Sequence, residues 1–234
     1  MLITISGPDG TGKTTQSKLL LNYFKKQGMK IAAVSDIIDN FNYQSGKSED
    51  LIRFYNYFKD YDAIHTRFRL HSNENARVMD KLEISPLGNF ELATLSAYTS
   101  YYDYIQWNRY VNEPLLREGK ILLCDKYAFD DIASKTTFGC QYEWMKKMYY
   151  NVELPNVGFY MSVEPKKIIE RNLNRPDGRI IFYDNEKNVR RLQYNYSRVI
   201  NDYNLVVLNG NDTAEAISQT VIDKVSKVIQ DLLW

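Results

Sequence analysis

Residues 7–14, Gly-Pro-Asp-Gly-Thr-Gly-Lys-Thr, satisfy the pattern G-x-x-x-x-G-K-[ST] without a mismatch. An apolar run, Leu2–Ser6, precedes the segment and a helical pattern over Thr14–Lys26 follows it. This is the strand–loop–helix context that the pattern requires. The glycines let successive backbone N–H groups, together with the positive end of the following helix, face an anion. The segment therefore predicts a nucleoside-triphosphate site, because a chance glycine turn does not need both flanking elements.

The residues of this loop have distinct chemical uses. Lys13 can reach the β- and γ-phosphate oxygens, and the Thr14 hydroxyl can ligate Mg²⁺. We therefore expect ATP and Mg²⁺ as cofactors. The predicted ATP-binding residues are Gly7, Gly10, Thr11, Gly12, Lys13, Thr14 and Thr15.

Short apolar runs separated by helical periodicity predict the fold. Strands alternating with helices are typical of a parallel sheet covered on both faces. We predict an α/β fold of three layers, a P-loop fold with a parallel five-stranded sheet flanked by helices. The five predicted strands are Leu2–Ser6, Lys30–Ser35, Ile121–Asp125, Val157–Val163 and Leu205–Asn209.

The interval from Asp36 to Gly119 holds no convincing strand. Helical patterns cover Leu51–Asp80 and Asn89–Arg117, and a further helix is predicted over Thr213–Leu232. Since no linker or repeat divides the chain, we predict one domain, residues 1–234, with a helical insertion at about 36–119.

Composition excludes several classes of protein. The 30 basic and 29 acidic residues leave a formal net charge of +1, which gives no general attraction to nucleic acid or to a membrane. No apolar run reaches the roughly 18 residues of a membrane helix. Cys124 and Cys140 are too few and too far apart for a disulfide framework or a metal pair. We expect a soluble, cytoplasmic protein with no nucleic-acid or membrane partner.

The wider sequence narrows the class of nucleotide user. A GTPase would carry an N-K-x-D motif, and the chain has none. Motors and helicases are larger and carry further motifs. The size and the remaining motifs favour a kinase that acts on a small molecule.

Three stretches, in this order, resemble the thymidylate kinase family of nucleoside monophosphate kinases. They are GPDGTGKTTQ at 7–16, ILLCDKYAFDDIASKTTFG at 121–139 and EPKKIIERNLNRPDGR at 164–179. The resemblance covers the chain to about Lys30 and again from about Asn112, and it is weak or absent between Asp36 and Tyr110. It implies ATP- and Mg²⁺-dependent phosphoryl transfer to a deoxynucleoside monophosphate, with dTMP as the default acceptor, in a homodimer packed through helices.

The resemblance also implies roles for three residues near the loop. Asp9 matches the acidic residue that holds the deoxyribose 3′-hydroxyl; the alternative is a solvated turn aspartate. Asp125 matches the aspartate of an Asp-Arg-Tyr signature, which orients the metal or the acceptor phosphate; the alternative is a helix N-cap. Lys126 replaces the arginine of that signature, so the charge remains but the planar fork that binds phosphate bidentately is lost.

Three arginines, Arg171, Arg175 and Arg179, are spaced by four residues. Pro176 must end a helix before it, so the last two are predicted to lie on a lid at about 171–183. In the branch of the family with glycine at the position of Gly10, the catalytic arginines come from this lid. We therefore expect Lys13, Asp125 and these three arginines to be catalytic; the alternative is a solvated basic loop.

Two acceptor-binding features of the family have no counterpart where we expect them. The Arg-Glu-Pro or Arg-Phe-Pro stretch after the second strand is replaced by AAVSDIIDNFN. The arginine of an Ala-x-Arg motif falls on Thr99 or, in another register, on a tyrosine or an isoleucine. Instead, residues 61–77 place His65, Arg69 and Asn73 on one face if they are helical. We predict a rebuilt acceptor site in which Arg69 and His65 contact the substrate beside Tyr98 and Tyr101. The alternatives are a solvated helix face with two structural histidines and tyrosines that pack in the core.

Two other functions remain open. Loss of the acceptor arginines favours a kinase of a nucleoside or another small hydroxylated acceptor. A non-catalytic nucleotide-binding regulator is the other alternative, but the complete set of Lys13, Thr14, Asp125 and lid arginines argues against it.

Overall fold

The computed structural model describes residues 1–34, 48–66, 88–174 and 185–232. Its described strands form one six-stranded sheet in which every neighbouring pair is parallel. In spatial order the strands are β2 (Ile31–Ala33), β3 (Ala63–Thr66), β4 (Ile121–Asp125), β1 (Leu2–Ser6), β5 (Val157–Ser162) and β6 (Val206–Asn209). The α/β class and the parallel sheet are confirmed, whereas the predicted number of five strands is wrong.

The strand that the sequence analysis missed is β3. A helix was predicted over Leu51–Asp80, but α3 (Ser48–Phe58) ends early and β3 begins at Ala63. This strand lies between β2 and β4, with Ala63 opposite both Ile31 and Ile121. All four of its side chains are buried although two are polar, His65 and Thr66. A short run of mixed polarity carries no strand pattern of its own, so burial between two neighbours decides its conformation.

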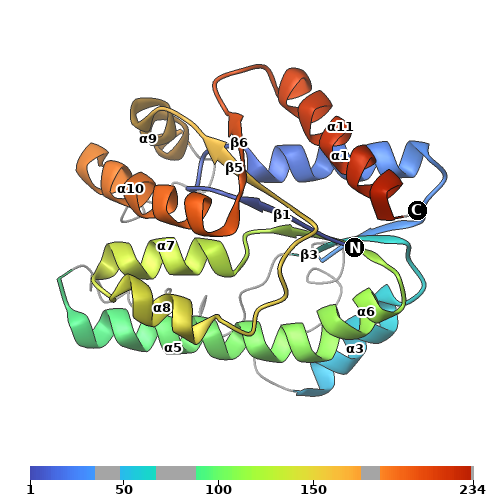
Figure 1. Cartoon of the computed structure of the whole chain (residues 1–234), viewed down its shortest axis with the longest axis horizontal. Coiled ribbons are helices and arrows are strands. Elements are labelled where there is room, and N and C mark those ends of the chain that lie inside the picture. The colour runs from blue at the N-terminus through green and yellow to red at the C-terminus, as the bar shows by residue number, and fades with distance from the viewer. Residues whose placement is uncertain (35–47, 67–87, 175–184, 233–234) are drawn as a thin grey trace.

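Helices cover both faces of the sheet (Figure 1). On one face lie α1 (Lys13–Lys26) and α11 (Ala214–Leu232), and on the other lie α5 (Phe90–Trp107), α7 (Ala128–Phe138) and α10 (Glu186–Tyr203). Besides α3, the other α-helices of the described residues are α6 (Glu113–Arg117), α8 (Tyr142–Met148) and α9 (Pro165–Leu173).

Strand β1 shows how the sheet divides the core. Leu2 packs into the cluster on the α5 side, whereas Ile3 and Ile5 pack into the cluster on the α1 and α11 side. This is the period-two alternation of a strand that is buried on both faces. The three predicted layers are therefore present around β1.

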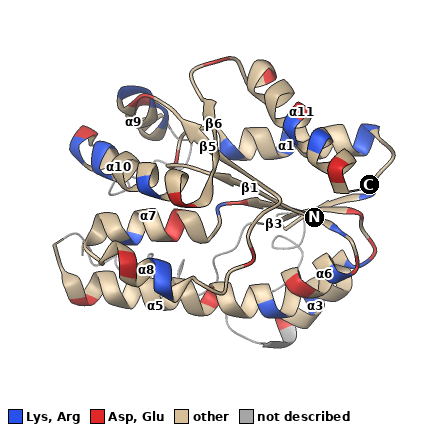
Figure 2. Ribbon diagram, in the orientation of Figure 1, with Lys and Arg blue, Asp and Glu red and all other residues tan. Residues whose placement is uncertain are grey.

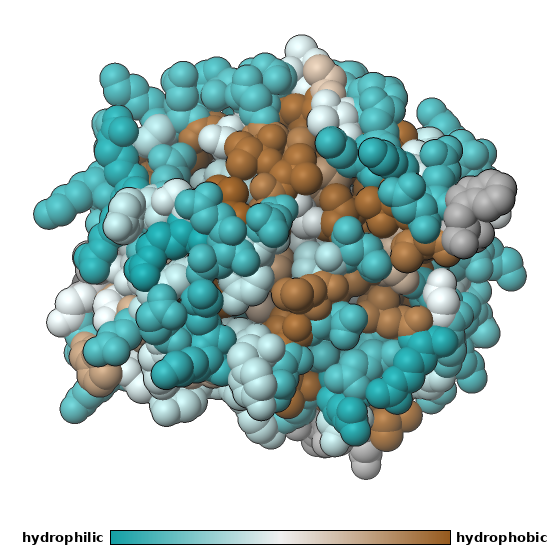
Figure 3. Space-filling model, viewed as in Figure 1, coloured by the Kyte–Doolittle hydropathy of each residue, from teal (hydrophilic) through white to brown (hydrophobic). Residues whose placement is uncertain are grey.

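Charged and hydrophobic side chains are distributed accordingly. Figure 2 shows Lys, Arg, Asp and Glu mainly on the helices and connecting segments, while the strands are largely free of them. Figure 3 shows hydrophobic residues at the centre of the same face, with hydrophilic residues around its rim. Among the helices of the described ranges, none combines the length and the apolar character needed to cross a bilayer.

The helix predicted over Asn89–Arg117 forms with one irregularity. Asn89 caps α5, its side-chain oxygen accepting from the Leu92 N–H at 3.1 Å. Between α5 and α6 the chain makes a π turn, η1 (Asn108–Asn112), in which Glu113 N–H donates to Asn108 O. Pro114 follows and has no N–H to continue the α-helical ladder. A wider turn at this point avoids the clash that a proline ring makes with the carbonyl four residues earlier.

Candidate active site

The glycine-rich loop lies at the carboxyl end of β1 and leads into α1. Gly10 and Gly12 have φ angles of 83° and 95°, in the left-handed region that glycine adopts without strain. A Cβ on Gly10 would also lie 2.5 Å from Asn172 Oδ1 and 3.2 Å from the Ile168 carbonyl oxygen. Close packing of α9 against the loop therefore requires glycine at position 10.

Lys13 folds back over this loop. Its ammonium group donates to the Pro8 carbonyl at 2.8 Å and lies 3.9 Å from Asp9 Oδ1. The Thr11 hydroxyl donates to the same carbonyl at 2.8 Å. The loop thus holds a buried cation beside backbone N–H groups, which is the arrangement that suits phosphate. Thr15 lies exposed in the first turn of α1.

Thr14 and Asp125 join the loop to the neighbouring strand. The Thr14 hydroxyl donates to Asp125 Oδ2 at 2.6 Å, and Asp125 is fully buried at the end of β4, opposite Ile5. Hydroxyl and carboxylate oxygens are hard ligands, and Mg²⁺ in nucleotide sites takes one or two of them alongside phosphate and water. The two residues therefore fit a Mg²⁺ ion bound together with a nucleotide.

An ion pair connects the glycine-rich loop with Lys126, the residue that follows β4. Lys126 Nζ lies 2.6 Å from Asp9 Oδ1, and the Lys126 side chain is largely buried. The Lys126 backbone has a φ of 76°, a conformation that is uncommon outside glycine and that is often found at functional sites. Asp9 and Lys126, predicted separately from the sequence, are thus brought into direct contact.

Asp130 is a residue of the site that the sequence analysis missed. Its buried carboxylate accepts four hydrogen bonds, two on each oxygen. Oδ1 accepts from Gly7 N at 3.0 Å and Tyr196 OH at 2.7 Å, and Oδ2 accepts from Ser6 Oγ at 2.8 Å and Tyr127 N at 2.8 Å. It therefore links the start of the loop to α7 and α10. The only sequence signal is its place in the first turn of a helix, where acidic residues are common.

The lid arginines are only partly described. Arg171 lies at the end of α9, where its guanidinium donates to the Gly10 carbonyl at 3.2 Å. Arg175 and Arg179, with most of the predicted lid, lie outside the described residues. One of the three predicted arginines is therefore seen against the loop.

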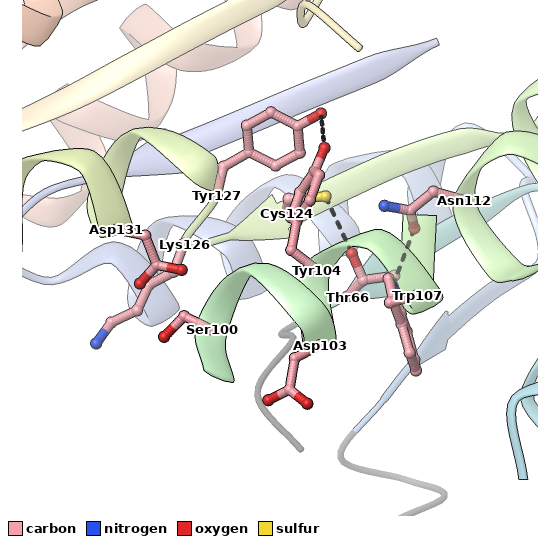
Figure 4. Close-up of a pocket in the computed structure, with 10 residues that line it drawn as sticks. All are labelled: Thr66, Ser100, Asp103, Tyr104, Trp107, Asn112, Cys124, Lys126, Tyr127 and Asp131. Carbon is pink, nitrogen blue, oxygen red and sulfur yellow. Dashed lines mark hydrogen bonds between the residues drawn. The ribbon is translucent and has the colours of Figure 1, made fainter. Parts of the chain in front are cut away.

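A cavity of about 30 Å³ lies beside Lys126, between the ends of β3 and β4 and the inner face of α5 (Figure 4). Tyr104 and Tyr127 meet in its wall, where Tyr104 OH donates to Tyr127 OH at 2.8 Å and Tyr127 OH donates to Glu153 O at 2.6 Å. Burial raises the pKa of both phenols well above the ordinary value, so both keep their protons. The lining residues are Thr66, Ser100, Asp103, Tyr104, Trp107, Asn112, Cys124, Lys126, Tyr127 and Asp131.

The predicted acceptor residues Tyr98 and Tyr101 are not among the residues that line this cavity. Tyr98 is 55% exposed and packs edge-on against Trp144, and Tyr101 packs edge-on against Tyr149. Neither lines the cavity, whose α5 residues are Ser100, Asp103, Tyr104 and Trp107. These follow the three- and four-residue spacing of one helix face, a pattern that the sequence shows but that does not reveal which face points inward.

His65 lies in a strand and not on a helix. His65 is buried within β3, so the predicted helical face over residues 65–73 is wrong at its first position. Arg69 and Asn73 lie outside the described residues.

A parallel sheet, a phosphate-binding loop at the end of β1, and the Thr14–Asp125 pair beside it define a P-loop nucleotide kinase. The sequence model of the family described as Thymidylate kinase matches residues 44–221, more than half of the chain. The chain belongs to the thymidylate kinase family. The match also spans residues 44–110, the interval in which the sequence motifs show weak or no resemblance to the family.

Two curated relatives match this chain over nearly its full length, and a third matches about half of it. A probable thymidylate kinase of Pyrococcus abyssi is 20% identical over 222 residues, 94% of this chain and 93% of the relative. One of Thermococcus gammatolerans is 23% identical over 233 residues, 98% of this chain and 97% of the relative. The thymidylate kinase of Arabidopsis thaliana is 25% identical over 134 residues, 54% and 49% of the two chains.

Proposed function

We propose that this nucleotide kinase transfers the γ-phosphoryl group of ATP, with Mg²⁺, to a deoxynucleoside monophosphate, and that the acceptor is dTMP. The observation that carries the proposal is the Asp9–Lys126 ion pair of 2.6 Å. It joins the phosphate-binding loop directly to the cavity lined by Lys126 and Tyr127. A glycine-rich donor loop and a neighbouring small cavity that share one charged contact suit direct transfer between two bound nucleotides. The family and the names of the relatives support dTMP.

In this proposal each group has one task. Lys13 exchanges its contact with the Pro8 carbonyl for the β- and γ-phosphate oxygens of ATP, and the backbone of Gly7, Gly10 and Gly12 surrounds the phosphates. Asp9 accepts from the acceptor's sugar hydroxyl, and Lys126 neutralises phosphate charge beside it. A bound Mg²⁺ ion, held through Thr14 and Asp125, supplies charge neutralisation at the β- and γ-phosphates.

The family's Arg-Glu-Pro or Arg-Phe-Pro stretch was expected after the second predicted strand, β2. The position of β3 in the sheet indicates a different place for its arginine. It is β3, not β2, that pairs with β4, the strand of Asp125. Thr66 lines the cavity and ends β3, and the next residues along the chain read Arg67-Phe68-Arg69. They lie outside the described residues. We propose that Arg67 and Arg69 bind the acceptor's phosphate.

Arg171, Arg175 and Arg179 complete the proposal. Guanidinium groups delivered by a lid neutralise charge that develops on the transferred phosphoryl group, and the contact of Arg171 with Gly10 O supports this role. We propose that residues 1–234 act as one kinase domain with this lid at about 171–183 and an acceptor-binding insertion at about 36–119.

We further propose a homodimer packed through helices. Four side chains of α5 at helical spacing point away from the core and are 38–56% exposed: Leu95, Tyr98, Tyr102 and Ile105. An apolar stripe of this kind suits burial against another helix. Sedimentation equilibrium tests the proposal, and a monomer at micromolar concentration would overturn it.

The transfer activity is tested by ADP release with purified protein, ATP and Mg²⁺ against nucleosides and nucleoside monophosphates. Lys13→Ala is the blank, since the loop backbone remains but the cation is lost. We expect turnover with dTMP. Turnover only with an unphosphorylated nucleoside would show that the protein is a nucleoside kinase instead. ATP binding without any turnover would favour a non-catalytic nucleotide-binding regulator.

A further inference from the structure

Asn112 presents an amide group inside the cavity that no step of the proposed transfer uses. The residue is 3% exposed and lines the cavity together with Trp107, Tyr104 and Thr66. Its side-chain oxygen accepts a hydrogen bond of 3.0 Å from the indole nitrogen of Trp107. Figure 4 shows the two side chains joined by this bond at the edge of the cavity.

The indole fixes which way the amide faces. Trp Nε1–H is only a donor, so the oxygen and not the nitrogen of Asn112 must face it. The Nδ2 group is then directed away from Trp107, and Figure 4 shows it on the side of Cys124 and Tyr104. Within the part of the chain that the structure describes, no group accepts a hydrogen bond from Nδ2. This donor is therefore available to a ligand that enters the cavity.

The π turn is what brings the two residues together. Trp107 and Asn112 are five positions apart, which in an α-helix would set their side chains about 140° apart. In η1 the hydrogen bonds close over five residues, so positions five apart lie on one side. Single π turns in α-helices are frequently found at functional sites. Here the turn adds an amide to the row of α5 side chains that faces the cavity.

We propose that Asn112 Nδ2 donates a hydrogen bond to a carbonyl oxygen of the acceptor's base and thereby selects an oxo-substituted pyrimidine over an amino-substituted one. The inference rests on the proposed function, because it names the group that reads the base in that acceptor site. Thymine offers a carbonyl oxygen at C4 where cytosine offers an amino group, which would place two donors face to face. Trp107 is a positioning residue, since it acts only by orienting the amide.

The test is the ratio of kcat/KM for dTMP to that for dCMP in wild type and in Asn112→Asp. This variant keeps an oxygen for Trp107 but places a second oxygen where the donor was. We expect kcat/KM for dTMP to fall about 10- to 100-fold, while dCMP, whose amino group can donate to the new carboxylate, loses less or gains. Trp107→Phe frees the amide to rotate, so the ratio should fall by a smaller factor.

Asn195→Asp is the matched control. Asn195 is also a buried asparagine, 4% exposed, but its Nδ2 donates to Thr137 Oγ1 at 2.9 Å away from the cavity. It should leave the dTMP-to-dCMP ratio unchanged even if it lowers stability. An unchanged ratio in Asn112→Asp, with wild-type KM for ATP, would overturn the inference.

Calorimetric titration with dTMP and with dCMP separates the two proposals. If wild type shows no turnover but binds dTMP more tightly than dCMP, and Asn112→Asp removes the preference, the base contact stands and the transfer activity fails. If wild type turns over dTMP and Asn112→Asp keeps its preference, the transfer stands and the base contact fails. Absence of both turnover and binding overturns both.

Discussion

Replacement of Asp130 by asparagine should destabilise the protein and loosen the phosphate-binding loop together. The carboxylate accepts from two backbone groups, Gly7 N–H and Tyr127 N–H, and from two hydroxyls, those of Ser6 and Tyr196. Each oxygen serves one backbone donor and one hydroxyl. An amide keeps one such oxygen and places an NH₂ group against the other pair.

The expected loss of folding free energy depends on which groups the new NH₂ group faces. The hydroxyl of Ser6 or Tyr196 can rotate and accept, but the backbone N–H cannot, so one buried donor loses its acceptor whichever way the amide turns. That costs about 1–3 kcal/mol, and loss of the charge on the remaining bonds raises the total to about 2–4 kcal/mol. For a chain of this length the melting temperature should fall by roughly 4 to 16 °C.

The assay is urea unfolding followed by circular dichroism, together with KM for ATP. Because Gly7 N–H belongs to the loop, KM for ATP should rise when the Gly7 contact is lost. Asp131→Asn is the control for stability. Among the residues that the structure describes, the Asp131 carboxylate accepts only from the Tyr149 hydroxyl, at 3.0 Å, and a hydroxyl can rotate. That control should lose less than about 1 kcal/mol.

The reasoning has a clear point of failure. If Asp130→Asn unfolds within about 0.5 kcal/mol of wild type, the four hydrogen bonds do not hold the loop as the buried geometry indicates. Tyr196→Phe removes a single hydroxyl donor and leaves the carboxylate with three partners, so it should lose about 1 kcal/mol. A larger loss in Tyr196→Phe than in Asp130→Asn would also contradict the argument.

Three other perturbations test separate parts of the molecule. Gly10→Ala places a Cβ 2.5 Å from Asn172 Oδ1 at a φ of 83°, so it should lower stability by roughly 1–3 kcal/mol and weaken ATP binding; wild-type ATP affinity would contradict the required close approach. The hydrogen bond from Lys146 lowers the pKa of Asp202. The pair therefore adds stability above the unfolded carboxylate pKa of about 4 and loses it as the pH falls through the lower folded pKa. Since both groups are partly exposed, Asp202→Asn should lower the free energy of unfolding by less than about 1 kcal/mol at pH 7 and not at pH 2, as measured by urea titration at each pH. Burial raises the pKa of the Cys124 thiol to about 12, so a disulfide reagent at pH 8 should label it only as fast as the protein opens; rapid labelling of the native protein would refute this.

The elements that could be predicted from the sequence are those with a strong local pattern. Leu2–Ser6 and Ile121–Asp125 were predicted with the bounds that β1 and β4 have, because continuous apolar runs between turn signals need no distant information. The phosphate-binding loop is likewise local, since its function depends on backbone N–H groups and on glycine. The contact between Asp9 and Lys126 was not predicted, although both residues were.

Tertiary structure decided the features whose signal lies in their neighbours. β3 is a strand because β2 and β4 pair with it, and its sequence of Ala, Ile, His and Thr does not require that conformation. Asp130 matters because chain segments distant in sequence place donors around one buried carboxylate, and Asn112 faces the cavity because a π turn precedes Pro114. The sequence by itself predicted a phosphate-binding loop on an α/β scaffold, because backbone geometry and hydrophobic period are local properties. Which side chains surround the acceptor depended on how α5 packs beside β3 and β4, because helical spacing alone does not say which face is buried.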